Sequence, residues 1–137
     1  MRLPLLLLLI PLGSCVVVDI TGGCDDELVR MERDPEGPLA AFHYIRNCGA
    51  TTEYVTQIAV GPASRGLEGA TPIFVAVPDA DTDTDGHGIW LEMRWTAPHQ
   101  LSVAHAEKAR VFKRVMQVDG ARIRYRAMAR MASPMVD

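Results

Sequence analysis

Aromatic residues, cysteines and long apolar runs are all scarce in this chain. Only eight of its 137 residues are Phe, Trp or Tyr, so a core has to be built mostly from aliphatic side chains and methionine. Hydrophobic residues make up 48% of the chain and charged residues 23%. This length and balance exclude a large two-domain enzyme, a collagen-like chain and a fully disordered one. They indicate one small globular domain.

The apolar stretch at the N-terminus is too short for an ordinary membrane-spanning helix. It covers residues 3–12, follows a positively charged start and contains Pro4 and Pro11, whereas a spanning helix needs about 20 apolar residues. A basic start followed by a short apolar stretch is typical of a secretory signal. We therefore predict a signal peptide over residues 1–14, with a short uncleaved anchor as the alternative.

The three cysteines, Cys15, Cys24 and Cys48, are an odd number for an exported protein, so one of them needs a separate role. Cys15 ends the segment Leu-Gly-Ser-Cys, which resembles a bacterial lipobox, the sequence that precedes a lipid-modified cysteine. Lipidation of Cys15, with palmitate or another acyl chain, would leave Cys24 and Cys48 to form a disulfide bond in an oxidising compartment. Two alternatives stay open. Either Cys24 carries the lipid and Cys48 is a lone thiol, or the signal is a plain secretory one and Cys15 is incidental.

These features divide the chain into four segments and predict where it resides. We expect a signal peptide over 1–14, a lipidated cysteine and tether over 15–26, a β domain over 27–130 and a loose tail over 131–137. Val16 follows Cys15, and no Asp stands there to indicate retention in the inner membrane. The predicted location is the bacterial cell envelope, lipid-anchored and facing the periplasm, on the outer membrane rather than the inner one.

Most of the chain after residue 26 alternates apolar and polar residues with a period of two, which is typical of half-buried strands. Residues 89–95 alternate in this way, with Trp90, Glu92 and Arg94 on the polar side. Asp119-Gly120 is a strong signal for a two-residue turn. Residues 111–118 and 121–128 are therefore predicted to form an antiparallel hairpin. Further strands are predicted at 27–33, 38–47, 53–60, 72–77 and 100–105.

The predicted fold class is mostly β. Short strands separated by tight turns favour a single small antiparallel β-sheet domain, arranged as a meander, a sandwich or a partly open barrel. Asp34-Pro35-Glu36-Gly37 is one such predicted turn. Residues 101–116 contain Ala, Glu, Lys and Arg that also tolerate a helix, so a helix there stays open as an alternative.

One phrase resembles a family. Cys48-Gly-Ala-Thr-Thr52, followed by Tyr54-Val-Thr-Gln-Ile58, is similar to a phrase in small uncharacterised proteobacterial envelope lipoproteins. A later Trp95 and the segment Arg110-Val-Phe112 are also similar, so the resemblance covers about residues 24–125. The family has a Pro-Asp-Gly-type turn where this chain has Asp34-Pro35-Glu36-Gly37. The resemblance implies an envelope location and this fold, and it implies no activity.

An acidic segment suggests a divalent cation. Residues 81–86 read Asp-Thr-Asp-Thr-Asp-Gly, and Glu92 follows the glycine by six residues, which satisfies a calcium-loop pattern. Ca²⁺ prefers carboxylate and carbonyl oxygens, so Asp81, Asp83, Asp85 and Glu92 are the candidate ligands. The prolines and β-branched residues before the segment forbid the incoming helix of an EF-hand. The alternative is a solvated acidic hairpin loop that binds no metal.

Charge is unevenly distributed along the chain. Its net charge is −3, but residues 19–92 carry 14 acids and four bases, whereas residues 93–137 carry nine bases and three acids. On a strand, Arg122, Arg124 and Arg126 would project from one face. Such a row suits phosphates of lipid headgroups or an acidic protein partner. The alternative is a solvated face whose arginines pair with acids on the neighbouring strand.

No catalytic motif is evident. His43, His87, His99 and His105 lack the spacing of a zinc protease, and the chain has no Cys-x-x-Cys. Net negative charge and export argue against a nucleic-acid partner. We therefore predict a non-catalytic binding or structural module anchored to the envelope membrane, with an envelope protein as a further candidate partner. The alternatives are an exported Ca²⁺-binding domain and, more weakly, a small periplasmic enzyme without a recognisable motif.

Overall fold

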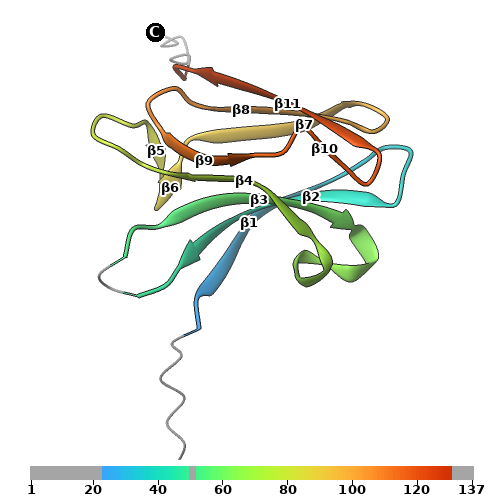
Figure 1. Ribbon diagram of the computed structural model, residues 1–137, viewed down its shortest axis with the longest axis horizontal. Helices are drawn as coiled ribbons and strands as arrows, with labels where there is room; N and C mark the ends of the chain where they lie inside the picture. The colour runs from blue at the N-terminus through green and yellow to red at the C-terminus, as the bar shows by residue number, and fades with distance from the viewer. Residues whose placement is uncertain (1–22, 50–51, 131–137) are drawn as a thin grey trace, which may run out of the picture.

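The computed structural model describes residues 23–49 and 52–130, which form a two-layered β-sandwich (Figure 1). The mostly-β fold class is thus confirmed, and of the three predicted arrangements the sandwich is the one observed. The described ranges contain no α-helix, only two short 3₁₀ turns at Ala63–Arg65 and Leu67–Gly69. No helix in these ranges has the length and apolar character needed to cross a membrane.

Residues 23–49 and 52–130 contain eleven strands, arranged in two main sheets and one small hairpin. They are β1 (Asp25–Arg33), β2 (Leu39–Asn47), β3 (Val55–Pro62), β4 (Thr71–Val77), β5 (Thr84–Asp85), β6 (Gly88–Ile89), β7 (Leu91–Ala97), β8 (Gln100–Ala106), β9 (Arg110–Arg114), β10 (Gln117–Val118) and β11 (Ala121–Met128). The five-stranded sheet has the order β1-β2-β3-β4-β9, and the four-stranded sheet has the order β10-β11-β8-β7. β5 and β6 pair only with each other.

The predicted strands agree with β1, β2, β3, β4, β7 and β8 to within a few residues at their ends. β1 begins at Asp25, however, so the last two residues of the predicted tether belong to a strand. Asp25 lies opposite Asn47 in the β1–β2 ladder. Cys24 and Cys48 form a disulfide bond next to this pair, as predicted. Cys15, the predicted signal peptide and the predicted tail lie outside the described residues.

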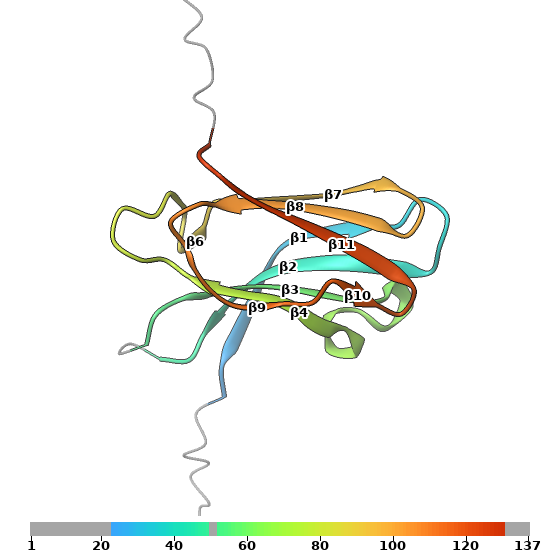
Figure 2. The same cartoon turned by 45° about the horizontal axis from the view of Figure 1, so that its top comes forward.

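The predicted hairpin of residues 111–118 with 121–128 is only partly correct. Asp119 and Gly120 do form the turn, with φ of 47° and 85°, but only Gln117 and Val118 pair across it. β9 pairs instead with β4 in the five-stranded sheet. β11 runs parallel to β8 in the other sheet. The chain therefore changes layers between β9 and β11 (Figure 2), and the helix alternative for residues 101–116 is wrong.

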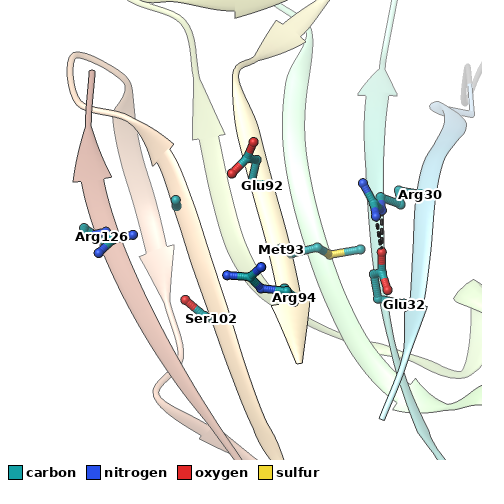
Figure 3. Close-up of a pocket in the computed structure, with 8 residues that line it drawn as sticks. Arg30, Glu32, Glu92, Met93, Arg94, Ser102 and Arg126 are labelled. Atoms are coloured by element: carbon teal, nitrogen blue, oxygen red, sulfur yellow. Dashed lines mark hydrogen bonds and ion pairs between the residues drawn. The ribbon is translucent and has the colours of Figure 1, made fainter. Parts of the chain in front are cut away.

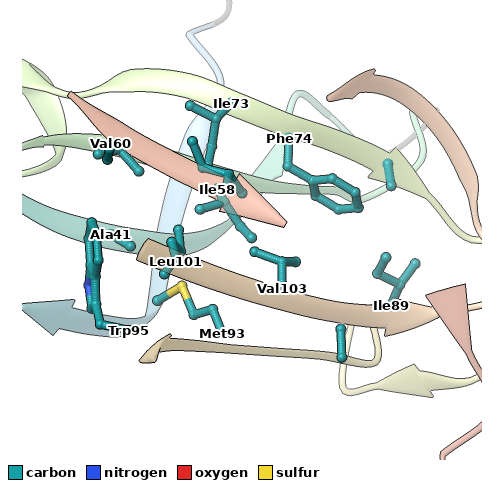
Figure 4. Packing of buried hydrophobic residues seen from close by; sticks show 14 of the residues in the cluster. Ala41, Ile58, Val60, Ile73, Phe74, Ile89, Met93, Trp95, Leu101 and Val103 are labelled. Carbon is teal, nitrogen blue, oxygen red and sulfur yellow. The ribbon is translucent and has the colours of Figure 1, made fainter. Parts of the chain in front are cut away.

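The core lies between the two sheets (Figure 4). Its largest fully buried side chains come from both layers: Phe74, Ile58 and Ile73 from the five-stranded sheet, and Leu101, Val103 and Ile123 from the four-stranded sheet. Trp90, predicted to lie on the polar side of its strand, is 7% exposed. It lies between β6 and β7, where its backbone NH bonds to the Asp83 carbonyl, so the alternation restarts at Leu91.

A buried carboxylate connects two turns at one end of the sandwich. Asp34 Oδ2 accepts a hydrogen bond from the backbone NH of His99 at 3.1 Å, and His99 Nδ1 lies 2.8 Å from the same oxygen. Asp34 Oδ1 accepts one from the backbone NH of Glu36 at 3.2 Å. A Cβ at Gly37 would lie 3.0 Å from Asp34 Oδ2, so this position favours glycine. The predicted turn at residues 34–37 therefore joins the β1–β2 connection to the β7–β8 connection.

Candidate functional site

A row of arginines covers the outward face of β11. Arg122, Arg124 and Arg126 are all exposed, whereas the intervening Ala121 and Ile123 are at most 1% exposed. This alternation is the one expected from the sequence. Because the inward residues pack in the core and successive side chains of a strand point to opposite faces, the arginine side chains point to solvent.

The neighbours of this row are set by the parallel pairing of β11 with β8. Arg124 lies beside Ser102, and Arg126 lies beside Ala104. On the far side of β8, Arg94 of β7 lies beside Ser102 and Glu92 beside Ala104. The strand next to the arginine row thus offers no acid, and the only carboxylate on these outward positions is one strand further away.

The arginine face, defined here as Arg94, Arg122, Arg124 and Arg126, carries excess positive charge. Within the described residues, none of these four guanidinium groups forms an ion pair, although six other ion pairs occur there. The arginines of β11 are therefore not paired with acids on the neighbouring strand β8. The face therefore keeps an excess of positive charge, with neutral residues of β8 between Arg94 and the row on β11.

A shallow pocket lies in the arginine face (Figure 3). Its volume is about 350 Å³, and it is lined by Ser102 and Ala104 between Arg94 and Arg126. Glu92 and the Arg30–Glu32 ion pair of β1 complete its lining. Guanidinium groups on two sides of small neutral residues can donate paired hydrogen bonds to a phosphate or carboxylate.

Sequence reasoning missed Arg94 as part of this face. It lies in the strand predicted at 89–95, on the polar side with Glu92. The alternation along residues 89–95 correctly predicted which side of its strand Arg94 lies on. It could not predict the strand order, in which β7 and β11 are both neighbours of β8. Only that order brings Arg94 to the same face as Arg124.

Within the described part of the chain, no group of three or more His, Cys, Asp or Glu side chains is placed to hold a cation. Asp83 is held by Arg130 through two hydrogen bonds of 2.9 and 3.0 Å. Asp85 lies in the β5–β6 hairpin, and Glu92 is on the arginine face. Asp81 has a φ of 64° in the loop before them. The sequence matches the calcium-loop pattern, but the candidate ligands Asp81, Asp85 and Glu92 lie in a loop, in β5 and in β7 respectively.

The histidines have structural surroundings, and two of them are buried. His105 Nε2 is 2.9 Å from an Arg114 nitrogen that can only donate, so His105 Nδ1 carries the proton and donates to the Ala106 carbonyl at 3.0 Å. Burial lowers the pKa of His105. Burial also lowers the pKa of His43, to about 4. His87 stacks on Tyr54 with ring centres 4.3 Å apart.

Comparisons with known proteins add no relative. No protein-family model matches the chain, no curated protein is significantly similar to it, and no solved structure matches its fold at a significant level. Functional argument therefore rests on the arginine face and its surroundings.

Proposed function

We propose that this protein is an exported, lipid-anchored envelope protein without catalytic activity. In this proposal the arginine face binds the phosphate groups of anionic membrane lipids. The observation that carries the proposal is the arrangement of four arginines without an ion-pair partner among the described residues, around the neutral outward side chains of β8. Each arginine near an anionic membrane surface contributes about 1 kcal/mol of attraction.

Two features support an anchor and an export route. The short apolar N-terminus and the lipobox-like Leu-Gly-Ser-Cys15 predict lipidation, and disulfides such as Cys24–Cys48 persist in oxidising compartments. A lipid on Cys15 would leave residues 16–23 as a tether before the disulfide. Eight residues span at most about 28 Å when fully extended. In both ribbon views β1 begins on the side of the sandwich away from β7, β8 and β11 (Figures 1 and 2). The chain before the disulfide therefore has to turn around the domain for the arginine face to lie on the membrane that holds the lipid.

The anchor is tested by mass. The wild-type protein from a bacterial membrane fraction is expected to begin at Cys15 and to carry diacylglycerol and a fatty acyl group. The variant Cys15→Ser is expected to lack this lipid, because serine has no thiol to form the thioether. Intact-mass spectrometry without reductant measures both. Lipid that persists in Cys15→Ser would move the anchor to Cys24 and contradict the proposal.

The arginine face is tested with vesicles and with lipid-free protein comprising residues 16–137. Wild type is expected to co-sediment with vesicles containing phosphatidylglycerol and not with pure phosphatidylcholine. The double variant Arg124→Gln/Arg126→Gln removes two charges and is expected to weaken binding roughly 30-fold at low salt, from about 1 kcal/mol per arginine. Binding should also weaken as salt rises, since exposed charges are screened.

Two control variants isolate the face from net charge. Arg65→Gln/Lys113→Gln removes the same charge from exposed positions in the 3₁₀ turn Ala63–Arg65 and in β9, so its vesicle affinity should stay close to wild type. Glu92→Gln removes the one acid of the face and should strengthen binding. Equal weakening by both double variants would mean that only net charge matters, and the proposed face would be wrong. Binding to an acidic protein with no binding to the vesicles would redirect the proposal to a protein partner.

A further inference from the structure

A second cleft lies where the two sheets leave a gap between their edge strands. Its volume is about 560 Å³, and it opens between β1 and the β5–β6 hairpin. Arg30 lines both this cleft and the pocket in the arginine face, but none of the four arginines of that face lines the cleft. Aliphatic side chains form much of its lining: Val29 from β1, Ile45 from β2, Ile89 from β6 and Leu91 from β7. A ligand with an aliphatic body would remove this apolar surface from water.

The shape of the cleft depends on an irregularity in β1. Leu28 and Arg30 lie opposite the consecutive residues Tyr44 and His43, which leaves Val29 as an extra residue. Such bulges bend a strand and redirect its side chains. On the other side, a Cβ at Gly88 would lie 2.8 Å from the Ile45 side chain. The hairpin is therefore packed closely against β2, and both walls of the cleft are fixed by the backbone.

The cleft is lined by a buried histidine that lacks a partner. His43 is 8% exposed, and its Nε2 has no hydrogen-bond partner in the described structure. Buried polar atoms are nearly always hydrogen-bonded, and an exception needs an explanation. Because burial holds the pKa of His43 at about 4, the ring is neutral near pH 7. A neutral imidazole offers one donor and one acceptor nitrogen.

Uncompensated negative charge surrounds this histidine. Glu27 and Asp85 line the cleft, and neither forms an ion pair within the described residues. The one cation in the lining, Arg30, is paired with Glu32. The negative charge of Asp85 raises the pKa of His43 and so partly opposes the effect of burial. The positive charge of Arg30 lowers this pKa further. The cleft therefore favours a cation that also has apolar surface.

We propose that this cleft binds a small aliphatic primary amine in its ammonium form. The ammonium group lies between the carboxylates of Glu27 and Asp85, next to the neutral ring of His43. The aliphatic chain lies along Val29, Ile45 and the hairpin. This site is separate from the arginine face, so it can be correct whether or not the protein binds membranes.

The test uses the hexylammonium ion as the probe, with hexanol and hexanoate as matched controls. Residues 16–137 contain every described residue of the sandwich and are labelled with ¹⁵N. Hexylammonium is expected to shift the amide signals of the cleft and the ring nitrogens of His43. Hexanol should bind roughly 10-fold more weakly, because it lacks attraction to two exposed carboxylates. Hexanoate should not bind. Equal binding of hexanoate, or shifts confined to other surfaces, would overturn the proposal.

Variants separate the charges from the histidine. Glu27→Gln/Asp85→Asn is expected to weaken hexylammonium binding roughly 10-fold and to leave hexanol binding unchanged. The charge-matched Glu36→Gln/Glu107→Gln, at exposed positions outside the cleft, should leave both unchanged. His43→Leu should weaken hexylammonium more than hexanol. If His43→Leu fails to fold, the carboxylate variants still decide the question, since unchanged affinity in Glu27→Gln/Asp85→Asn contradicts the proposal.

Discussion

Loss of the disulfide between Cys24 and Cys48 is expected to lower the free energy of unfolding by about 3 kcal/mol, the entropy effect of a closed loop of this length. The two cysteines are 24 positions apart, and the bond closes the end of the β1–β2 ladder. β1 needs this support because it is an edge strand whose residues are nearly all exposed. Without the bond, hydrogen bonds to β2 alone would hold its first residues.

Denaturant unfolding of the Cys24→Ser/Cys48→Ser variant measures this effect and avoids new free thiols. A loss of about 3 kcal/mol in a domain of this size corresponds to a fall in Tm of more than about 10 °C. The same loss should follow reduction of the wild type. The lipid-free protein of residues 16–137, which keeps both Cys24 and Cys48, is the reference and should keep the full stability. Identical midpoints with and without reductant would contradict the expected role of the bond.

Acidification is expected to destabilise the protein through His43. The pKa of His43 is lowered from 6.5 to about 4 by burial in the folded state. As pH falls through 6.5, the unfolded chain takes up a proton at this position and the folded chain does not. The contribution of His43 to the free energy of unfolding is therefore complete above pH 6.5, the pKa of the unfolded chain. It is lost progressively as the pH falls to about 4, the pKa in the folded state. The expected loss from this one group is about 3 kcal/mol.

Unfolding experiments across this pH interval check the prediction, with variants that assign the slope. His43→Leu is expected to flatten the dependence of stability on pH. His105, whose pKa is also lowered by burial, contributes with the same sign and leaves a residual slope in that variant. His87→Gln, at an exposed position, should keep the wild-type slope. A His43→Leu variant with an unchanged slope would show that His43 is not the responsible group.

Local features were predictable from the sequence and long-range ones were not. Strand positions follow from alternation, and the turn at Asp119-Gly120 follows from the need for positive φ. A turn signal, however, says nothing about how far a ladder extends. Val115 donates its backbone NH to the Ile73 carbonyl at 2.8 Å, and Tyr125 Oη donates to the Val115 carbonyl at 2.7 Å. These distant contacts keep β9 in the five-stranded sheet.

The candidate sites show the same division. The outward row on β11 was predictable because it needs only alternation along one strand. Its lack of acidic neighbours depends on strand order, which alternation does not encode. In the acidic segment a complete local pattern was present, but it could not show that Asp83 accepts a hydrogen bond from Arg130, 47 positions away. The cleft beside His43 of β2 depends on the bulge at Val29 of β1, and the sequence around either residue contains no pattern that predicts it.

The change of layers between β9 and β11 also constrains the order in which the protein assembles. β11 runs parallel to β8, and a parallel neighbour requires a connection that leaves the sheet and returns. Here that connection is itself a strand of the opposite layer, so the chain reaches β8 with residues 121–128 only after it has passed through the five-stranded sheet. The ordered basic surface comes into existence only when folding is complete.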